Sequence, residues 1–77
     1  MERGDLVRVW SSAGYAYAYQ RVDETMVKSP NLKAGTLAMY LGPNDKEAAY
    51  FNQPMVDVTV GDVLYTIDKR FLEVILV

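Results

Sequence analysis

The sequence predicts an all-β fold, and three observations carry this prediction. Segments in which apolar and polar residues alternate recur along the 77-residue chain. Turn-forming residues separate these segments, most clearly at residues 42–45 ("GPND") and 61–62 ("GD"). The alternating segments amount to about five main strands, and so short a chain favours a small barrel because closure removes exposed sheet edges. We therefore expect residues 1–77 to form one small β-barrel domain with a long first loop.

The first predicted strand lies in "GDLVRVW". Val7 and Val9 share one face of it, and Leu6, Arg8 and Trp10 share the other. The valine face is the predicted core face. Because tryptophan is mostly buried in proteins, we expect Trp10 to pack beneath the connection that follows.

Residues 11–34 are predicted to form a long connection, and a connection of this length is usually functional or has structure of its own. It begins with "AGYAYAYQ", in which Tyr15, Tyr17 and Tyr19 stand at every second position. Two interpretations of this row are open. The tyrosines could cover the barrel mouth with their hydroxyls in water. Alternatively, Ala16 and Ala18 could pack on the barrel while the rings face outward.

The next strand is predicted in "GTLAMYLG", residues 35–42. One face of this strand carries three large aliphatic side chains, and we expect it to face the core. The expected core residues are Leu37, Met39 and Leu41, and the expected outer residues are Thr36, Ala38 and Tyr40.

A hairpin is predicted in "MVDVTVGDVLYTI", residues 55–67, with Gly61-Asp62 as its two-residue loop. A loop of this length determines which residues face each other across the two strands. The expected pairs are Val60 with Val63, Val58 with Tyr65, and Val56 with Ile67, all on one apolar face. Turn chemistry and hydrophobic pattern therefore predict the same register.

The chain ends in "DKRFLEVILV", residues 68–77. The polar "DKR" predicts a short turn or a single helical turn. The residues after it predict a last strand with Leu72, Val74 and Leu76 on one face.

Composition excludes several classes of function. Eight basic and ten acidic residues give a net charge of −2, which disfavours a binder of phosphate backbones. The chain has no histidine and no cysteine, so it lacks the commonest general base, thiol nucleophile and soft metal ligands. It also has no phosphate-binding or dinucleotide-binding glycine motif. We therefore expect no enzyme, no catalytic residue, no metal site and no cofactor.

Location is predicted from two further absences in the sequence. No apolar run is long enough to span a membrane. The N-terminus, "MERGDLVRVW", does not have the pattern of a secretory signal. We expect a protein of the cytoplasm with no membrane association.

The order of these segments resembles the Src-homology-three-like small barrels. In that family a first strand, a long loop, two strands, a tight hairpin, a short helical turn and a last strand follow one another. More narrowly, "GDLVRV" and "VLYTIDKRFLEVI" resemble small barrel proteins encoded by tailed bacteriophages, including phages of cyanobacteria. The resemblance implies a site of action in the host-cell cytoplasm or the virion. The tryptophan and acidic cluster with which signalling members bind proline-rich peptides are not matched here.

We expect this chain to be a non-enzymatic protein-interaction module that docks on a protein partner or on a second copy of itself. The predicted partner-binding residues are Tyr15, Tyr17, Tyr19, Arg21 and Tyr40. Tyrosine offers a large contact area at low cost in conformational entropy. The alternative is a nucleic-acid-binding small barrel that stacks bases on exposed aromatic rings. The acidic charge balance favours the first hypothesis.

Overall fold

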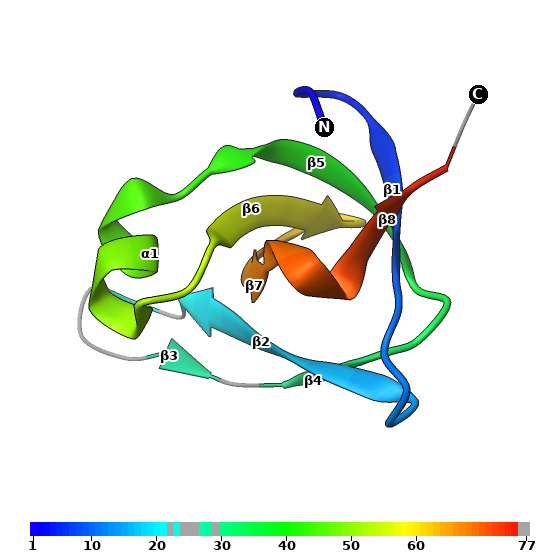
Figure 1. The fold of residues 1–77 in the computed structure, drawn as a ribbon, viewed down its shortest axis with the longest axis horizontal. Coiled ribbons are helices and arrows are strands. Elements are labelled where there is room, and N and C mark those ends of the chain that lie inside the picture. The colour runs from blue at the N-terminus through cyan, green and yellow to red at the C-terminus, as the bar shows by residue number, and fades with distance from the viewer. Residues whose placement is uncertain (22, 24–26, 29, 76–77) are drawn as a thin grey trace.

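The computed structural model describes residues 1–21, 23, 27–28 and 30–75 of the chain (Figure 1). These residues form eight strands, one α-helix and one 3-10 helix. The strands are β1 (Leu6–Val9), β2 (Tyr15–Arg21), β3 (Val27–Lys28), β4 (Asn31–Lys33), β5 (Leu37–Pro43), β6 (Met55–Val60), β7 (Val63–Asp68) and β8 (Leu72–Val74). The helices are α1 (Asp45–Phe51), between β5 and β6, and η1 (Lys69–Phe71), between β7 and β8.

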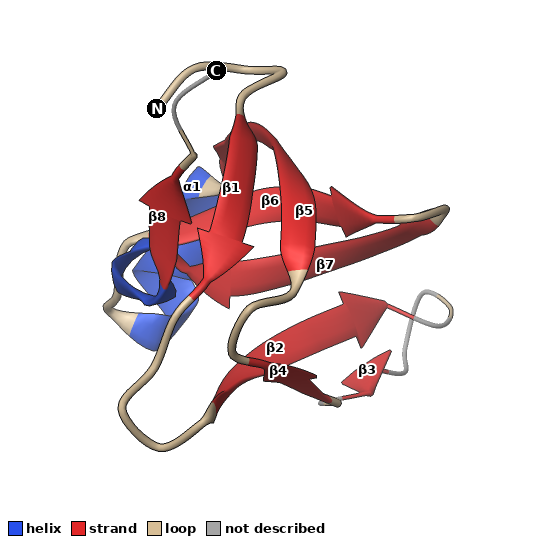
Figure 2. Ribbon diagram, turned by 90° about the vertical axis from the view of Figure 1, so that its right-hand side faces the viewer, coloured by secondary structure: helices blue, strands red, loops and turns tan. Residues whose placement is uncertain are grey.

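The strands form one curled antiparallel sheet. Its order is β3-β2-β7-β6-β5-β1-β8, and β4 pairs with β2 beside this path. Figure 2 shows β8, β1 and β5 side by side, with β6 and β7 crossing behind them. The sheet therefore curls around its own core as a half-barrel. The prediction of an all-β fold is confirmed.

The number of strands was predicted too low. Residues 11–34, expected to be a loop, contain β2, β3 and β4. Strand β2, which contains the Tyr-Ala alternation, pairs with β7 on one side and with β4 on the other. Pro30 precedes β4 directly, consistent with its inability to continue a strand ladder. Strand β2 thus pairs with β3 and β4 inside the connection itself and with the distant β7, so the connection contributes three strands to the sheet.

The predicted hairpin is confirmed. Strands β6 and β7 pair with Val60 opposite Val63, Val58 opposite Tyr65 and Val56 opposite Ile67. Gly61 has a φ of 60°, the positive value that the two-residue loop requires. Val58 and Ile67 are completely buried, whereas Asp57 and Thr59 point to the other face.

The core lies between the two halves of the curled sheet. Seven of the strands and the end of η1 contribute to it, and β2 contributes only alanines. The cluster of buried residues is Val7, Val9, Ala16, Ala18, Leu32, Ala38, Tyr40, Val56, Val58, Ile67 and Leu72, with Val60, Tyr65 and Phe71 packed against it.

The predicted faces of β5 were wrong. Ala38 and Tyr40 are buried, whereas Leu37 and Met39 are about half exposed. Strand β1 decides this orientation, because Ala38 pairs with the buried Val7. Both faces of β5 carry apolar residues, so its own pattern could not distinguish them. Tyr40 therefore belongs to the core, and its predicted place on the outer surface is corrected.

The predicted burial of Trp10 was also wrong, since the side chain is 57% exposed. Trp10 follows β1 on the same face as Arg8, and its backbone N–H donates to the carbonyl of Phe71. Strand β2 pairs with β7, so this strand does not fold over the outer face of β1. Strand β2 therefore does not cover the Trp10 side chain as predicted.

A turn was predicted at residues 42–45, but the chain continues from Asn44 into the capped helix α1, which was not predicted from the sequence. Asn44 is its N-cap, and the backbone N–H of Glu47 donates to the Asn44 Oδ1. The sequence N-x-x-E is a variant of the capping box, and acidic residues in the first turn favour a helix N-terminus. Asn52 ends the helix with a φ of 54°.

The end of the described chain follows the prediction in part. Residues 69–71 form the single helical turn η1, and β8 follows it. Leu72 is buried, but Val74 is 44% exposed at the edge of the sheet. Leu76, predicted to share the face of these two residues, lies outside the described residues.

Candidate functional site

Strand β2 presents its tyrosines on one face and its alanines on the other. Ala16 and Ala18 are fully buried, whereas Tyr15 is 39% and Tyr17 57% exposed. Tyr19 is half-buried. Of the two interpretations of the tyrosine row, the structure therefore supports the one in which the alanines pack on the barrel.

The pairing of β2 with β7 explains this orientation. Ala18 lies opposite the buried Ile67, and Tyr19 lies opposite Thr66 on the outer face. A shift by one residue would turn the tyrosines toward the closely packed core in place of the fully buried alanines. The sheet register therefore holds the three rings on the surface.

Helix α1 extends the row of tyrosine rings. The ring of Tyr19 stacks on that of Phe51, with centroids 4.7 Å apart. Tyr50 meets Phe51 edge to face at 4.9 Å, and Tyr15 meets Tyr17 edge to face at 5.5 Å. We call these five residues, Tyr15, Tyr17, Tyr19, Tyr50 and Phe51, the aromatic strip. The pKa of Tyr15 is raised, mainly by a side-chain hydrogen bond with Tyr17 and to a smaller extent by the negative charge of the Tyr17 phenolate.

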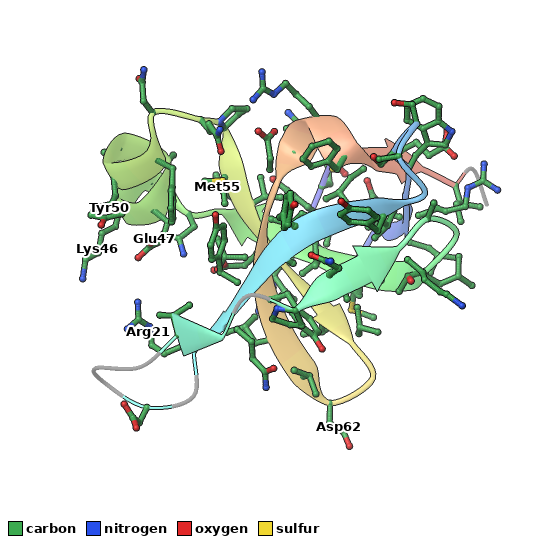
Figure 3. The ribbon with its side chains drawn as sticks, turned by 90° about the horizontal axis from the view of Figure 1, so that it is seen from below. Arg21, Lys46, Glu47, Tyr50, Met55 and Asp62 are labelled. Carbon is green, nitrogen blue, oxygen red and sulfur yellow. The ribbon has the colours of Figure 1, made fainter. Side chains whose placement is uncertain are left out.

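A groove of about 960 Å³ opens beside Tyr19, between α1 and the outer face of the sheet. Figure 3 shows Glu47 on the helix and Arg21, from the end of β2, facing it across the groove. The Arg21 Nη2 lies 3.5 Å from the Glu47 Oε1. The groove is lined by Tyr19, Arg21, Val27, Asn44, Lys46, Glu47, Ala49, Tyr50, Phe51, Asp57, Leu64 and Thr66.

The floor of this groove is a hydrogen-bonded polar cluster. The Asp57 Oδ1 accepts from the Thr66 Oγ1 at 2.7 Å and from the Asn44 Nδ2 at 3.1 Å. Asn44 also caps α1, so this carboxylate ties the start of the helix to β6 and β7. Helix α1, which lines the groove and carries Tyr50 and Phe51 of the aromatic strip, is thereby fixed to the sheet.

A smaller hollow, of about 200 Å³, borders Tyr17 and Tyr19 next to η1. Asp68 is buried there, and the Arg70 Nη2 donates to its Oδ2 at 2.6 Å. Burial raises the pKa of the Asp68 carboxyl, but the hydrogen bonds and charge of Arg70 outweigh it and hold the pKa below its usual value. The groove carries Arg21 and Lys46 with Glu47 and Asp57, and the smaller hollow carries Arg70 with Asp68. Positive and negative groups are therefore equal in number in each hollow.

The structure brings four of the five predicted partner-binding residues to one surface. Tyr15, Tyr17 and Tyr19 form the strip, and Arg21 continues the strand at the rim of the groove. Tyr40, the fifth, is 5% exposed in the core. Sequence reasoning missed Phe51, because residues 44–51 were not recognised as a helix. The capping pattern at Asn44 is the signal that would have placed Phe51 and Tyr50 correctly.

Nowhere in the described ranges do three or more aspartates or glutamates come together as a possible metal site. No helix in the same ranges is long and apolar enough to cross a membrane. What the arrangement offers is aromatic area, an open groove and two arginine–carboxylate pairs.

No protein-family model matches the chain, and searches of curated proteins and of solved structures found no significant match.

Proposed function

We propose that this chain is a non-enzymatic protein-interaction module that binds a protein partner through the aromatic strip and the adjoining groove. The observation that carries the proposal is the exposed tyrosine row, held outward by fully buried alanines on the same strand. An exposed apolar surface of this kind commonly marks an interaction site. Tyrosine is also enriched among the residues that dominate binding energies.

The shape of the site favours an extended segment of the partner. Tyr15 and Tyr19 are four residues apart on a strand, so the row is about 13 Å long. A segment lying along it would pass from Tyr17 over Tyr19 and enter the groove between α1 and β7. Leu64, half exposed in that groove, offers an apolar contact there. The paired charges of Arg21 and Glu47 favour a segment without strong net charge.

We also propose that the fold is a Src-homology-three-like barrel. The order of elements supports it, since β1, β5, β6, β7, η1 and β8 follow in the sequence expected of that family, with β2 to β4 in place of its long loop. The phage origin, and action in the host-cell cytoplasm or virion, rest on the same resemblance.

The test compares a Tyr15→Ser/Tyr17→Ser variant with the wild-type protein and with Trp10→Ser. Trp10 and Tyr17 are equally exposed, but Trp10 belongs neither to the aromatic strip nor to the lining of the groove. Each protein is immobilised and exposed to lysate of infected host cells, and affinity is then measured with the purified retained partner. We expect the double variant to keep its fold and lose binding at least tenfold, while Trp10→Ser retains it.

Two outcomes would overturn this proposal. If the double variant unfolds, the tyrosines are structural cover and not a binding surface. If the wild-type protein instead binds single-stranded DNA tightly at moderate salt, and this binding is lost in the double variant, the strip is a base-stacking surface.

A further inference from the structure

A second uncovered surface lies on the outer face of β5, β1 and β8. In Figure 2, none of the helices and loops of the described residues crosses in front of β1 and β5. Leu6 pairs with Met39, and Arg8 pairs with Leu37 on one side and with Glu73 on the other. We call these five residues, Leu6, Arg8, Leu37, Met39 and Glu73, the β1 face.

The register makes the β1 face contiguous. The neighbouring pairs Asp5–Tyr40 and Val9–Thr36 are joined by backbone hydrogen bonds. Leu6–Met39 and Arg8–Leu37 are therefore the closely spaced, non-hydrogen-bonded pairs of an antiparallel ladder, whose side chains approach each other most. Leu6 is 38%, Leu37 53% and Met39 49% exposed. Three large aliphatic side chains thus lie together in solvent on one sheet face.

The charges on this face are balanced. Arg8 and Glu73 form an ion pair across β1 and β8, and both side chains are nearly half exposed. A surface with one positive and one negative group has no net charge with which to select a charged partner. Such a surface is complementary to a copy of itself, because a two-fold contact can set the arginine of each molecule against the glutamate of the other. A two-fold contact between identical chains buries the same patch on both sides.

We propose that the β1 face is the interface of a homodimer. The small core supports a second copy, since small domains often gain stability by association. Three short strands provide less than a standard interface, so we expect a dissociation constant of about 10–100 µM.

The dimer would leave the aromatic strip free. Strands β1 and β2 are separated by β5, β6 and β7 in the sheet order, and both send their small apolar residues into the same core. Their outer faces therefore point away from each other. A dimer through the β1 face would carry two aromatic strips and could bind a repetitive partner with avidity.

Sedimentation equilibrium between about 10 µM and 1 mM protein tests this proposal, using wild type, Met39→Lys and Tyr17→Lys. Met39 and Tyr17 have similar exposure on different faces, so the second variant is the matched control. We expect the wild type to approach twice its 8.7 kDa mass, Met39→Lys to stay monomeric, and Tyr17→Lys to dimerise. A wild-type protein that stays monomeric at 1 mM overturns the proposal. So does loss of the dimer in Tyr17→Lys alone, which would place self-association on the aromatic strip.

A mixing experiment separates a true interface from a folding defect. Arg8→Glu gives the β1 face two negative charges, and Glu73→Arg gives it two positive charges. We expect each variant to be monomeric alone and the equimolar mixture to dimerise, more strongly at low salt than at high salt. If the mixture stays monomeric while the wild type dimerises, Arg8 and Glu73 do not meet across the contact and the assignment to this face fails.

Discussion

Neighbouring positions on β2 should differ in how strongly a leucine substitution destabilises the fold. Ala18 is fully buried against the core, whereas Tyr17 is 57% exposed on the outer face. Replacing Ala18 by leucine forces three additional carbons into a space that the structure fills. Overpacking of this kind costs about 1–3 kcal/mol. Replacing Tyr17 by leucine removes its edge-to-face contact with Tyr15, and we expect this exposed change to cost less than about 1 kcal/mol.

Thermal and urea unfolding followed by circular dichroism measures the difference. For a domain of this size, 1 kcal/mol shifts the melting midpoint by about 4–8 °C. We therefore expect Ala18→Leu to melt about 5–20 °C lower than the wild type and Tyr17→Leu to melt within a few degrees of it. The reasoning is refuted if Ala18→Leu is as stable as the wild type while Tyr17→Leu is strongly destabilised. The tyrosine face would then be the packed one, and the proposed site would not exist.

Three further predictions test the core, the helix cap and the buried ion pair. Val58→Asp places a carboxylate at a fully buried position and should unfold a domain whose total stability is about 4–12 kcal/mol; a melting midpoint that barely moves would contradict the core assignment. Asn44→Ala removes the cap of α1 and should lower the free energy of unfolding by about 1 kcal/mol in urea titrations, whereas the exposed Lys46→Ala should change it by less than about 0.5 kcal/mol. Because Arg70 holds the pKa of Asp68 below its unfolded value, this pair stabilises the fold above about pH 4 and loses its effect as pH falls through the folded pKa. Between pH 5 and pH 2, about the range of acid unfolding, Asp68→Asn should therefore lose less stability than the wild type; an identical pH profile would show that the pair contributes nothing.

Local chemistry was sufficient to predict some elements from the sequence. The Gly61-Asp62 loop and the alternation around it predicted both the hairpin and its register, because a two-residue turn leaves one way to pair the flanking strands. The polar residues 68–70 likewise predicted the helical turn η1. Each of these depends on residues that are adjacent in the chain.

The outward tyrosine row needed long-range pairing. Alternation in residues 15–19 established that tyrosines and alanines lie on opposite faces, but not which face is buried. The register between β2 and β7 decided this by placing Ala18 opposite Ile67. Strand β5 shows the same limit, since either of its faces could have been the core face until Ala38 paired with Val7.

The groove depends on tertiary structure in a further way. The sequence by itself determined that residues such as Asn44 can cap a helix and that Phe51 is apolar. Only the folded chain brings Phe51 onto Tyr19 and ties Asn44 to Asp57, across separations of 32 and 13 residues. Contacts between segments this far apart carry no local signal. They form because the curled sheet leaves one outer surface that α1 can cover, and that covering creates the site.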